Sequence, residues 1–333
     1  MTSRPQLLFL VAVFAALALL PLTGSRFLLD LAVQVLIFSL FALSLNVIAG
    51  HVGSVSFGHA AFLALGGYSC AWLQTRMGLP LAVTMVAVVV LTALASAVIG
   101  WFCVRLNQIY FSMLTLAFSM LIWAVAMKWK AVTGGDDGFV GIKVPELLQT
   151  PVGFFWFAWA VVGVSTALLW MLSKSTMGRA FLAIRENHVR ASFIGIDVSR
   201  MRLIAFVIAG VFAGLAGVLL ALNVRGMFPQ SAFWTQSGQV MIMVLLGGVH
   251  SFVGPILGAT TLYLLESFIH HYTQYWPLVL GLILLGLVLA APDGLVGLCQ
   301  RAWRKLAVRE GRPVSPPVTP EANAVIRSTE AVQ

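Results

Sequence analysis

About ten apolar runs, most of them near 20 residues long, follow one another along this 333-residue chain. A run of that length crosses the hydrocarbon core of a bilayer as an α-helix. Strands of a membrane barrel would be shorter and would alternate apolar with polar residues, so the runs argue against a barrel. We therefore expect an all-α polytopic membrane protein with about ten transmembrane helices. The expected crossings are roughly 7–22, 27–49, 56–75, 80–103, 109–128, 153–173, 201–223, 238–250, 252–270 and 276–291.

The composition agrees with this fold class and argues against other classes of protein. Only 9% of the residues are charged, whereas a soluble domain carries about 25%. The net charge of +9 does not predict nucleic-acid binding, because the basic residues cluster in loops between the apolar runs. The three cysteines form no CxxC pair, and the chain has no P-loop, HExxH or GxSxG motif. We therefore expect no enzyme activity and no cofactor or metal bound by the chain itself.

The longest polar stretch inside the chain, residues 174–202, predicts how the molecule is oriented. It holds six of the 20 Lys and Arg residues and only two acids, Glu186 and Asp197. Because short basic loops remain cytoplasmic, this stretch is expected inside the cell. Counting crossings from it places both chain termini in the cytoplasm and the loop 129–150 outside. The first apolar run lacks an A-x-A-type cleavage site, so we interpret it as a retained helix rather than a signal peptide.

Ten crossings divide into two sets of five at about residue 150. Because five is odd, the second set would enter from the opposite side, which is the topology of an inverted repeat. The third segment of each half is interrupted by glycine: residues 50–59 read GHVGSVSFGH, and the counterpart is the short run 240–248. Paired glycine-broken segments of this kind point to a transport pathway.

Polar residues near these breaks and near helix ends are the candidates for lining the pathway, and interhelical hydrogen bonding is the alternative interpretation. For His59, which follows a glycine near the start of a helix in SFGHAAF, a structural capping role is favoured. Glu266, followed by His270 and His271, is interpreted as an interfacial carboxylate rather than an intramembrane functional acid. The pathway candidates are Asn46, Ser56, His59, Tyr110, Thr115 and Gln239.

Small residues follow one face of the segment 201–223. Gly210, Gly214 and Gly217 recur at helical spacing, and Ala221 continues the row. Such a row lets a second helix approach closely, so we predict tight helix packing along it.

Within the polar stretch, residues 178–195 predict a short amphipathic helix that lies along the membrane surface. Its apolar face is expected to hold Phe181, Ile184 and His188. Arg185 and Arg190 are expected elsewhere on the helix, where Arg190 can pair with Glu186 at i,i+4 spacing. Such a helix could rest on anionic headgroups or dock into a groove on a soluble cytoplasmic protein.

Four blocks of sequence resemble the branched-chain amino-acid permeases, the M-type subunits of ATP-driven importers. The longest block is GRAFLAIRENHVRASFIGIDVSRMRLIAFVIAGVFAGLAG at 178–217. The others are GHVGSVSFGHAAFLALGGY at 50–68, IYFSMLTLAF at 109–118 with TGGDDG at 133–138, and VLLGGVHSFVGPILGA at 244–259. They occur in the family's order and cover most of the chain between about 40 and 295.

The resemblance implies that the loop helix contacts a cytoplasmic ATPase and passes nucleotide-driven closure of that ATPase to the membrane helices. The positions that match the family's pattern are Gly178, Arg179, Ala183, Arg185, Glu186, Asn187, Ala191, Gly195 and Ile196. The sequence departs from the pattern at His188, Arg190 and Ser192, at Asp293, where a basic residue is usual, and at His51, where an aromatic residue is common. The first three departures affect the detail of the ATPase contact.

The resemblance also implies the rest of an importer in a bacterial inner membrane. The implied partners are a second, H-type permease, two cytoplasmic ATPases that bind ATP and Mg, a periplasmic substrate-binding protein, and membrane lipid. Within the chain we distinguish an N-terminal segment with the first helix (1–26), a permease core (27–298) and a basic, then disordered, tail (299–333).

Two alternatives remain at this stage. The same class of importer could carry urea, short amides or small organic acids instead of branched-chain amino acids. An ion-coupled secondary transporter would need no ATPase, but it would be expected to hold several ionisable residues in its core. A membrane enzyme would need a set of polar catalytic residues that the sequence lacks.

Overall fold

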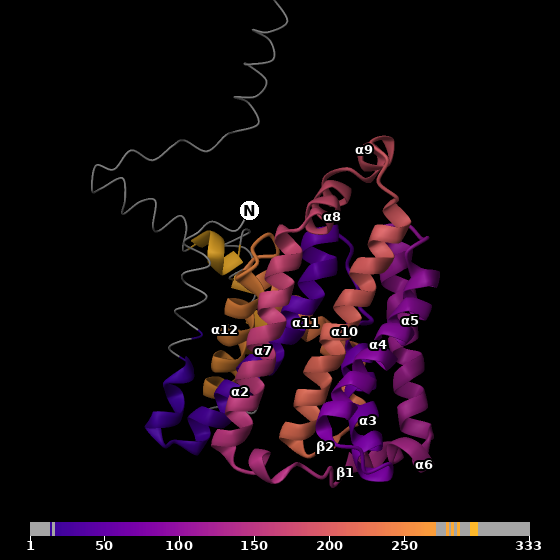
Figure 1. Cartoon of the computed structure of the whole chain (residues 1–333). Coiled ribbons are helices and arrows are strands. Elements are labelled where there is room, and N and C mark those ends of the chain that lie inside the picture. Colours follow the sequence, from indigo (N-terminus) through magenta and orange to yellow (C-terminus); the bar gives the residue numbers. More distant parts are fainter. Residues whose placement is uncertain are drawn as a thin grey trace, which may run out of the picture. The chain divides into compact units, whose positions relative to one another are not determined.

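The computed structural model describes residues 14, 17–270, 278–279, 281–282, 285–286 and 294–298. Five of its helical segments are long and apolar enough to cross a membrane: Arg26–Val52, Leu81–Cys103, Gln108–Lys128, Pro151–Lys174 and Val198–Val224. These segments confirm an all-α polytopic membrane protein. Figure 1 shows them running side by side along most of their lengths.

The helical elements follow the expected segments closely where the structure describes them. The long helices are α2 (Arg26–Asn46), which continues into the π-turn η2 (Val47–Val52), then α4 (Leu81–Cys103), α5 (Gln108–Lys128), α7 (Pro151–Lys174) and α10 (Val198–Val224). Shorter helices are α3 (His59–Arg76), α6 (Lys130–Thr133), α8 (Thr176–Glu186), α9 (His188–Phe193), α11 (Trp234–Gly247) and α12 (Gly254–His270). Single turns occur at η1 (Leu20–Thr23), η3 (Gly135–Asp137), η4 (Glu146–Leu148) and η5 (Pro229–Ala232).

The first and last expected crossings, 7–22 and 276–291, lie largely outside the described residues, as does the tail 299–333. The count of ten and the two inverted halves therefore stay predictions. Within the first segment, Phe14 contacts α7, because the indole Nε1–H of Trp159 donates to the Phe14 carbonyl over 3.0 Å.

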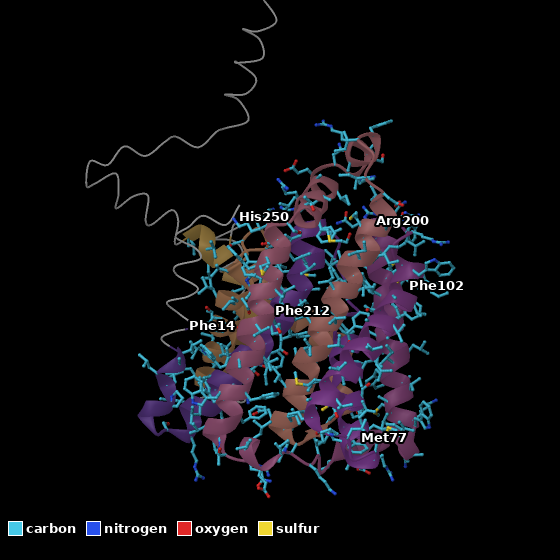
Figure 2. The ribbon with its side chains drawn as sticks, viewed as in Figure 1. Phe14, Met77, Phe102, Arg200, Phe212 and His250 are labelled. Atoms are coloured by element: carbon cyan, nitrogen blue, oxygen red, sulfur yellow. The ribbon has the colours of Figure 1, made fainter. Side chains whose placement is uncertain are left out.

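The loops gather at two ends of the bundle. One end, called here the α8 end, holds residues 47–58, 104–107, 175–197 and 248–253. The opposite end holds residues 77–80, 129–150 and 225–233, where β1 (Phe139–Val140) pairs antiparallel with β2 (Gly226–Met227). Figures 1 and 2 show this division, with Arg200 and His250 at the α8 end and Met77 at the other.

Local sequence sets where the helices around the polar stretch begin. Thr150 caps α7, and its Oγ1 accepts from the Gly153 N–H over 3.1 Å. Ser175 does the same for α8 and Asp197 for α10, over 3.2 and 3.0 Å. Ser, Thr and Asp are favoured at this position because their side-chain oxygens accept backbone N–H groups that have no partner within the helix. The caps at Ser175 and Asp197 therefore set the starts of α8 and α10 within the polar stretch.

The predicted glycine row packs as expected. On α10, Gly210 faces Ser96 of α4, whose Cβ would lie 2.6 Å from a Cβ added to the glycine. A Cβ on Gly217 would overlap the backbone carbonyl of Leu63 on α3, and one on Gly66 would overlap the backbone of Gly214. The α3–α10 contact therefore brings backbone against backbone, which only glycine permits.

We expect Gly217→Ala to destabilise the protein by about 1–3 kcal/mol, because the added methyl group forces α3 and α10 apart. Gly238→Ala is the matched control, since nothing lies within 4 Å of a Cβ added to Gly238 on α11. Replacing glycine by alanine at an open helix position leaves stability unchanged or raises it slightly. Thermal unfolding of the two variants in detergent measures the difference, and equal midpoints for both would contradict the close contact.

Candidate functional site

The helix α8 lies across the ends of the membrane-spanning helices with one face turned inward. Gly178, Phe181 and Ile184 recur every three residues on this face and are buried. Gly178 has no room for a side chain, because an added Cβ would lie 2.7 Å from the Ser173 carbonyl oxygen of α7. His188, which was expected on the same face, is exposed beyond the end of the helix.

The single helix predicted over 178–195 is wrong, because Asn187 divides it into α8 and α9. The Asn187 backbone is extended, and its Oδ1 accepts from the N–H groups of Val189 and Arg190, each over 3.0 Å. The side chain thus caps α9 as a new helix. With the break in place, the predicted i,i+4 ion pair between Glu186 and Arg190 does not form, whereas Arg200 pairs with Asp197 over 3.0 Å.

The far end of α9 is closed by a second cap. Gly195 has a left-handed backbone, φ +87°. Its N–H donates to the Ser192 carbonyl over 3.0 Å, and the Ile196 N–H donates to the Ala191 carbonyl over 3.1 Å. This pair of bonds is a Schellman motif, which favours glycine at the left-handed position. Four of the positions expected from the resemblance therefore shape the two-helix unit: Asn187, Ala191, Gly195 and Ile196.

The outer side of the two helices carries the groups that are free to meet another molecule. Arg179 and Glu186 are exposed there, and a groove of about 240 Å³ lies at the junction of α8 and α9. The groove is lined by Ala183, Glu186, Asn187, Arg190, Ala191 and Ile194. At its tip, the side chains of Phe193 and Ile194 are 85% and 75% exposed. These two residues are not among the positions that resemble the family, although two adjacent apolar residues in a polar loop are a signal that the sequence contains.

Arg185 points the other way, into the protein. Its Nη1 donates to the Gly50 carbonyl over 2.5 Å, and its Cγ lies 2.9 Å from the place of a Cβ on Gly53. Gly53 has φ +80°, so glycine suits both its backbone and its contact. The arginine thus connects α8 to the first glycine-broken segment.

The two glycine-broken segments meet at the α8 end. A Cβ on Gly50 would lie 2.5 Å from the Val249 carbonyl oxygen in the turn between α11 and α12. The Asn46 side-chain amide donates to the Ser251 carbonyl over 3.5 Å, and Nδ1 of His51 lies 3.2 Å from the Asn46 carbonyl. Asn46 therefore bridges breaks that are 205 residues apart in the chain.

Three other pathway candidates lie on the inner side of the first break, and each has a structural contact. Thr115 on α5 accepts from the Phe57 N–H over 3.3 Å, and Ser56 accepts from the Gly58 N–H over 3.4 Å. His59 is fully buried, with its Nε2 2.7 Å from the Ser44 Oγ. Its ring also stacks on Phe41, with centroids 5.2 Å apart. These groups hold the loop 53–58 between α2 and α5.

The last two pathway candidates lie elsewhere. The Tyr110 side chain is 61% exposed on the outer face of α5. Gln239 on α11 donates from Nε2 to the Glu266 carboxylate on α12 over 3.5 Å. In the described residues no group of three or more His, Cys, Asp or Glu side chains is placed to hold a metal ion.

Comparison with known proteins identifies relatives of the chain. The family model of the permease component of branched-chain amino acid transport systems matches residues 27–291. The chain is 28% identical over 318 residues to the high-affinity branched-chain amino acid transport system permease protein LivM of Escherichia coli, covering 87% of this chain and 75% of the relative. It is 30% identical over 182 residues to the autoinducer 2 import system permease protein LsrC of Klebsiella pneumoniae, covering 51% and 49%. No solved structure matches the chain.

We expect Asn187→Ala to loosen α9, because the loss of an N-cap costs about 1 kcal/mol. Asn187→Ser retains a capping oxygen and serves as the matched control. Amide hydrogen exchange measured over residues 188–194 should rise several-fold in the alanine variant and change little in the serine variant. Equal exchange in both would show that the side chain does not hold the break.

Proposed function

The chain belongs to the family of permease components of branched-chain amino acid transport systems, and we propose that it is the M-type permease subunit of an ATP-driven importer in a bacterial inner membrane. Its cargo is a branched-chain amino acid or a related small amino acid or amide. The match over residues 27–291 carries the proposal, because it includes both helix breaks and the α8–α9 unit. The chain moves its cargo without catalysing a reaction.

The cytoplasmic ATPase binds at the α8 end. The loops and helix termini there, from Arg105 to Arg202, carry seven basic and two acidic side chains, whereas those of the opposite end between Arg76 and Arg225 carry five basic and three acidic ones. The more basic end faces the cytoplasm by the positive-inside rule. This orientation puts α8, α9 and their groove where an ATPase can reach them. With ten crossings in two inverted halves, both termini are also cytoplasmic.

The remaining partners follow from this orientation. A periplasmic binding protein docks on the opposite end, around 129–150 and 224–237, where β1 and β2 join the two loops. A second, H-type permease completes the channel, and two ATPases supply ATP and Mg sites. Cargo selection lies mainly in the binding protein, because relatives named for branched-chain amino acids and for autoinducer 2 are both similar to this chain.

The transport cycle is a population shift between inward-open and outward-open states. Binding of ATP closes the ATPase pair, which moves the α8–α9 unit seated on it. The energy of that contact favours one state of the helices only to the extent that the contact differs between the two states. The exposed apolar side chains at the tip of α9 provide a contact of this kind if the ATPase buries them in one state only. Burying one large apolar side chain contributes about 1.5–3 kcal/mol to the free energy of association.

Replacing Phe193 and Ile194 together by serine should lower ATP-dependent leucine uptake at least about tenfold, because a loss of about 1.4 kcal/mol already weakens association tenfold. The protein is co-expressed with the binding protein, second permease and ATPases of the proposed importer. Uptake is measured in proteoliposomes, and co-purification of the ATPases is measured in parallel.

The matched control carries Leu94→Ser and Val98→Ser, two side chains that are each 60% exposed on α4. It should retain the ATPases, because α4 is remote from the groove. Unchanged uptake in the Phe193→Ser, Ile194→Ser variant would show that the α9 tip does not contact the ATPase. Leucine uptake by the unmodified complex that persists without any ATPase would contradict the importer class itself.

A further inference from the structure

The structure points to an internal role for Arg185, and the inference rests on the proposed function. We propose that Arg185 is a positioning residue that transmits movement of α8 to the helix break at Gly50, and through Gly50 to the turn between α11 and α12. The ATPase contact then belongs to other residues of the α8–α9 unit. The proposal depends on three consecutive contacts among described residues.

The first contact joins α8 to the end of α2. Gly50 lies in the π-turn η2, where α2 ends and its last carbonyl groups have no partner within the helix. The Arg185 guanidinium donates to one of these carbonyls over 2.5 Å. A cation at a helix C-terminus also interacts favourably with the helix dipole. In the described residues Arg185 forms no salt bridge, so this carbonyl is the partner recorded for its charged group.

The second contact is steric and makes the link stiff. The stem of Arg185 rests on Gly53, where an added Cβ would lie 2.9 Å from its Cγ. Because Gly53 offers no side chain that could rotate away, displacement of α8 toward the bundle presses directly on backbone. Arg185 therefore holds Gly50 by a hydrogen bond and Gly53 by van der Waals contact. Movement of α8 in either direction acts on the first break through this one side chain.

The third contact carries the movement to the second half of the chain. Gly50 abuts the Val249 carbonyl, and Asn46 reaches the Ser251 carbonyl over 3.5 Å, which is at the long limit for a hydrogen bond. Asn46 Oδ1 and Ser251 Oγ are both buried without a hydrogen-bond partner. Unpaired buried polar atoms cost free energy. A different arrangement of the two breaks, in which Asn46 Oδ1 and Ser251 Oγ gain hydrogen-bond partners, would therefore be favoured by that pairing.

The test separates transmission from assembly by using the complete transporter in proteoliposomes. Arg185→Met removes the donor, and Arg185→Lys keeps a positive charge and a donor. We expect the methionine variant to assemble with the ATPases and hydrolyse ATP, while amino acid imported per ATP falls at least tenfold. The lysine variant should recover part of this ratio. Arg200→Met, which removes an exposed ion pair with Asp197, is the control and should leave the ratio unchanged.

A second measurement does not depend on uptake. Ser251→Cys is labelled with a maleimide in the nucleotide-free and ATP-trapped complexes. We expect its labelling rate to change at least fivefold between the two states when Arg185 is present and to stay constant in the Arg185→Met background. A labelling change that survives in Arg185→Met, or an unaltered transport ratio, would overturn the proposal.

The same experiments distinguish failure of this inference from failure of the proposed function. If the unmodified complex imports amino acid with ATP and Arg185→Met does so equally well, the role of Arg185 is wrong and the importer assignment stands. If the unmodified complex shows no ATP-dependent uptake, the importer assignment fails, and the role of Arg185 fails with it.

Discussion

The close approach of α3 and α10 is the contact on which the rest of the described bundle depends. A Cβ on Gly66 or Gly217 would overlap backbone of the opposite helix, so at these glycines the two helices touch backbone to backbone. In a membrane, helix association relies on such van der Waals packing, because lipid tails are as apolar as the side chains they replace. Helix α4 then packs on the same row through Ser96. The loops at each end take their positions from this core.

The helix breaks are tolerated because their backbone groups find partners inside the protein. Irregular backbone at membrane depth is stable only where protein or water satisfies its polar groups. Gln108 donates to the Gly53 carbonyl, and Ser112 donates to the Val55 carbonyl over 2.6 Å. Arg185 satisfies the Gly50 carbonyl. The side chains that stabilise the first break therefore come from α5 and α8, so movement of either helix acts on it.

The α8–α9 unit combines rigid construction with an exposed outer surface. Caps at Ser175 and Asn187 and the Schellman motif at Gly195 fix its shape. Phe193 and Ile194, in contrast, expose most of their apolar surface. The position of the unit at the more basic end of the bundle agrees with a cytoplasmic partner.

The sequence by itself determined the fold class, because apolar runs of membrane-spanning length leave the backbone no stable state except the helix. It also predicted the glycine row on α10 and the two glycine-broken segments, since glycine at those spacings has a direct steric meaning. It did not predict the break at Asn187, because helical periodicity continues through 178–195 and only the side-chain cap interrupts it.

Only the tertiary structure decided which way each polar side chain points. Arg185 and Arg179 both match the family pattern, yet Arg185 turns inward to Gly50 whereas Arg179 is exposed. Asn46 links the two breaks only because its side chain reaches the carbonyl of Ser251, a residue 205 positions away. No local pattern encodes such pairs, because they depend on which helices the packing of α3 and α10 brings together.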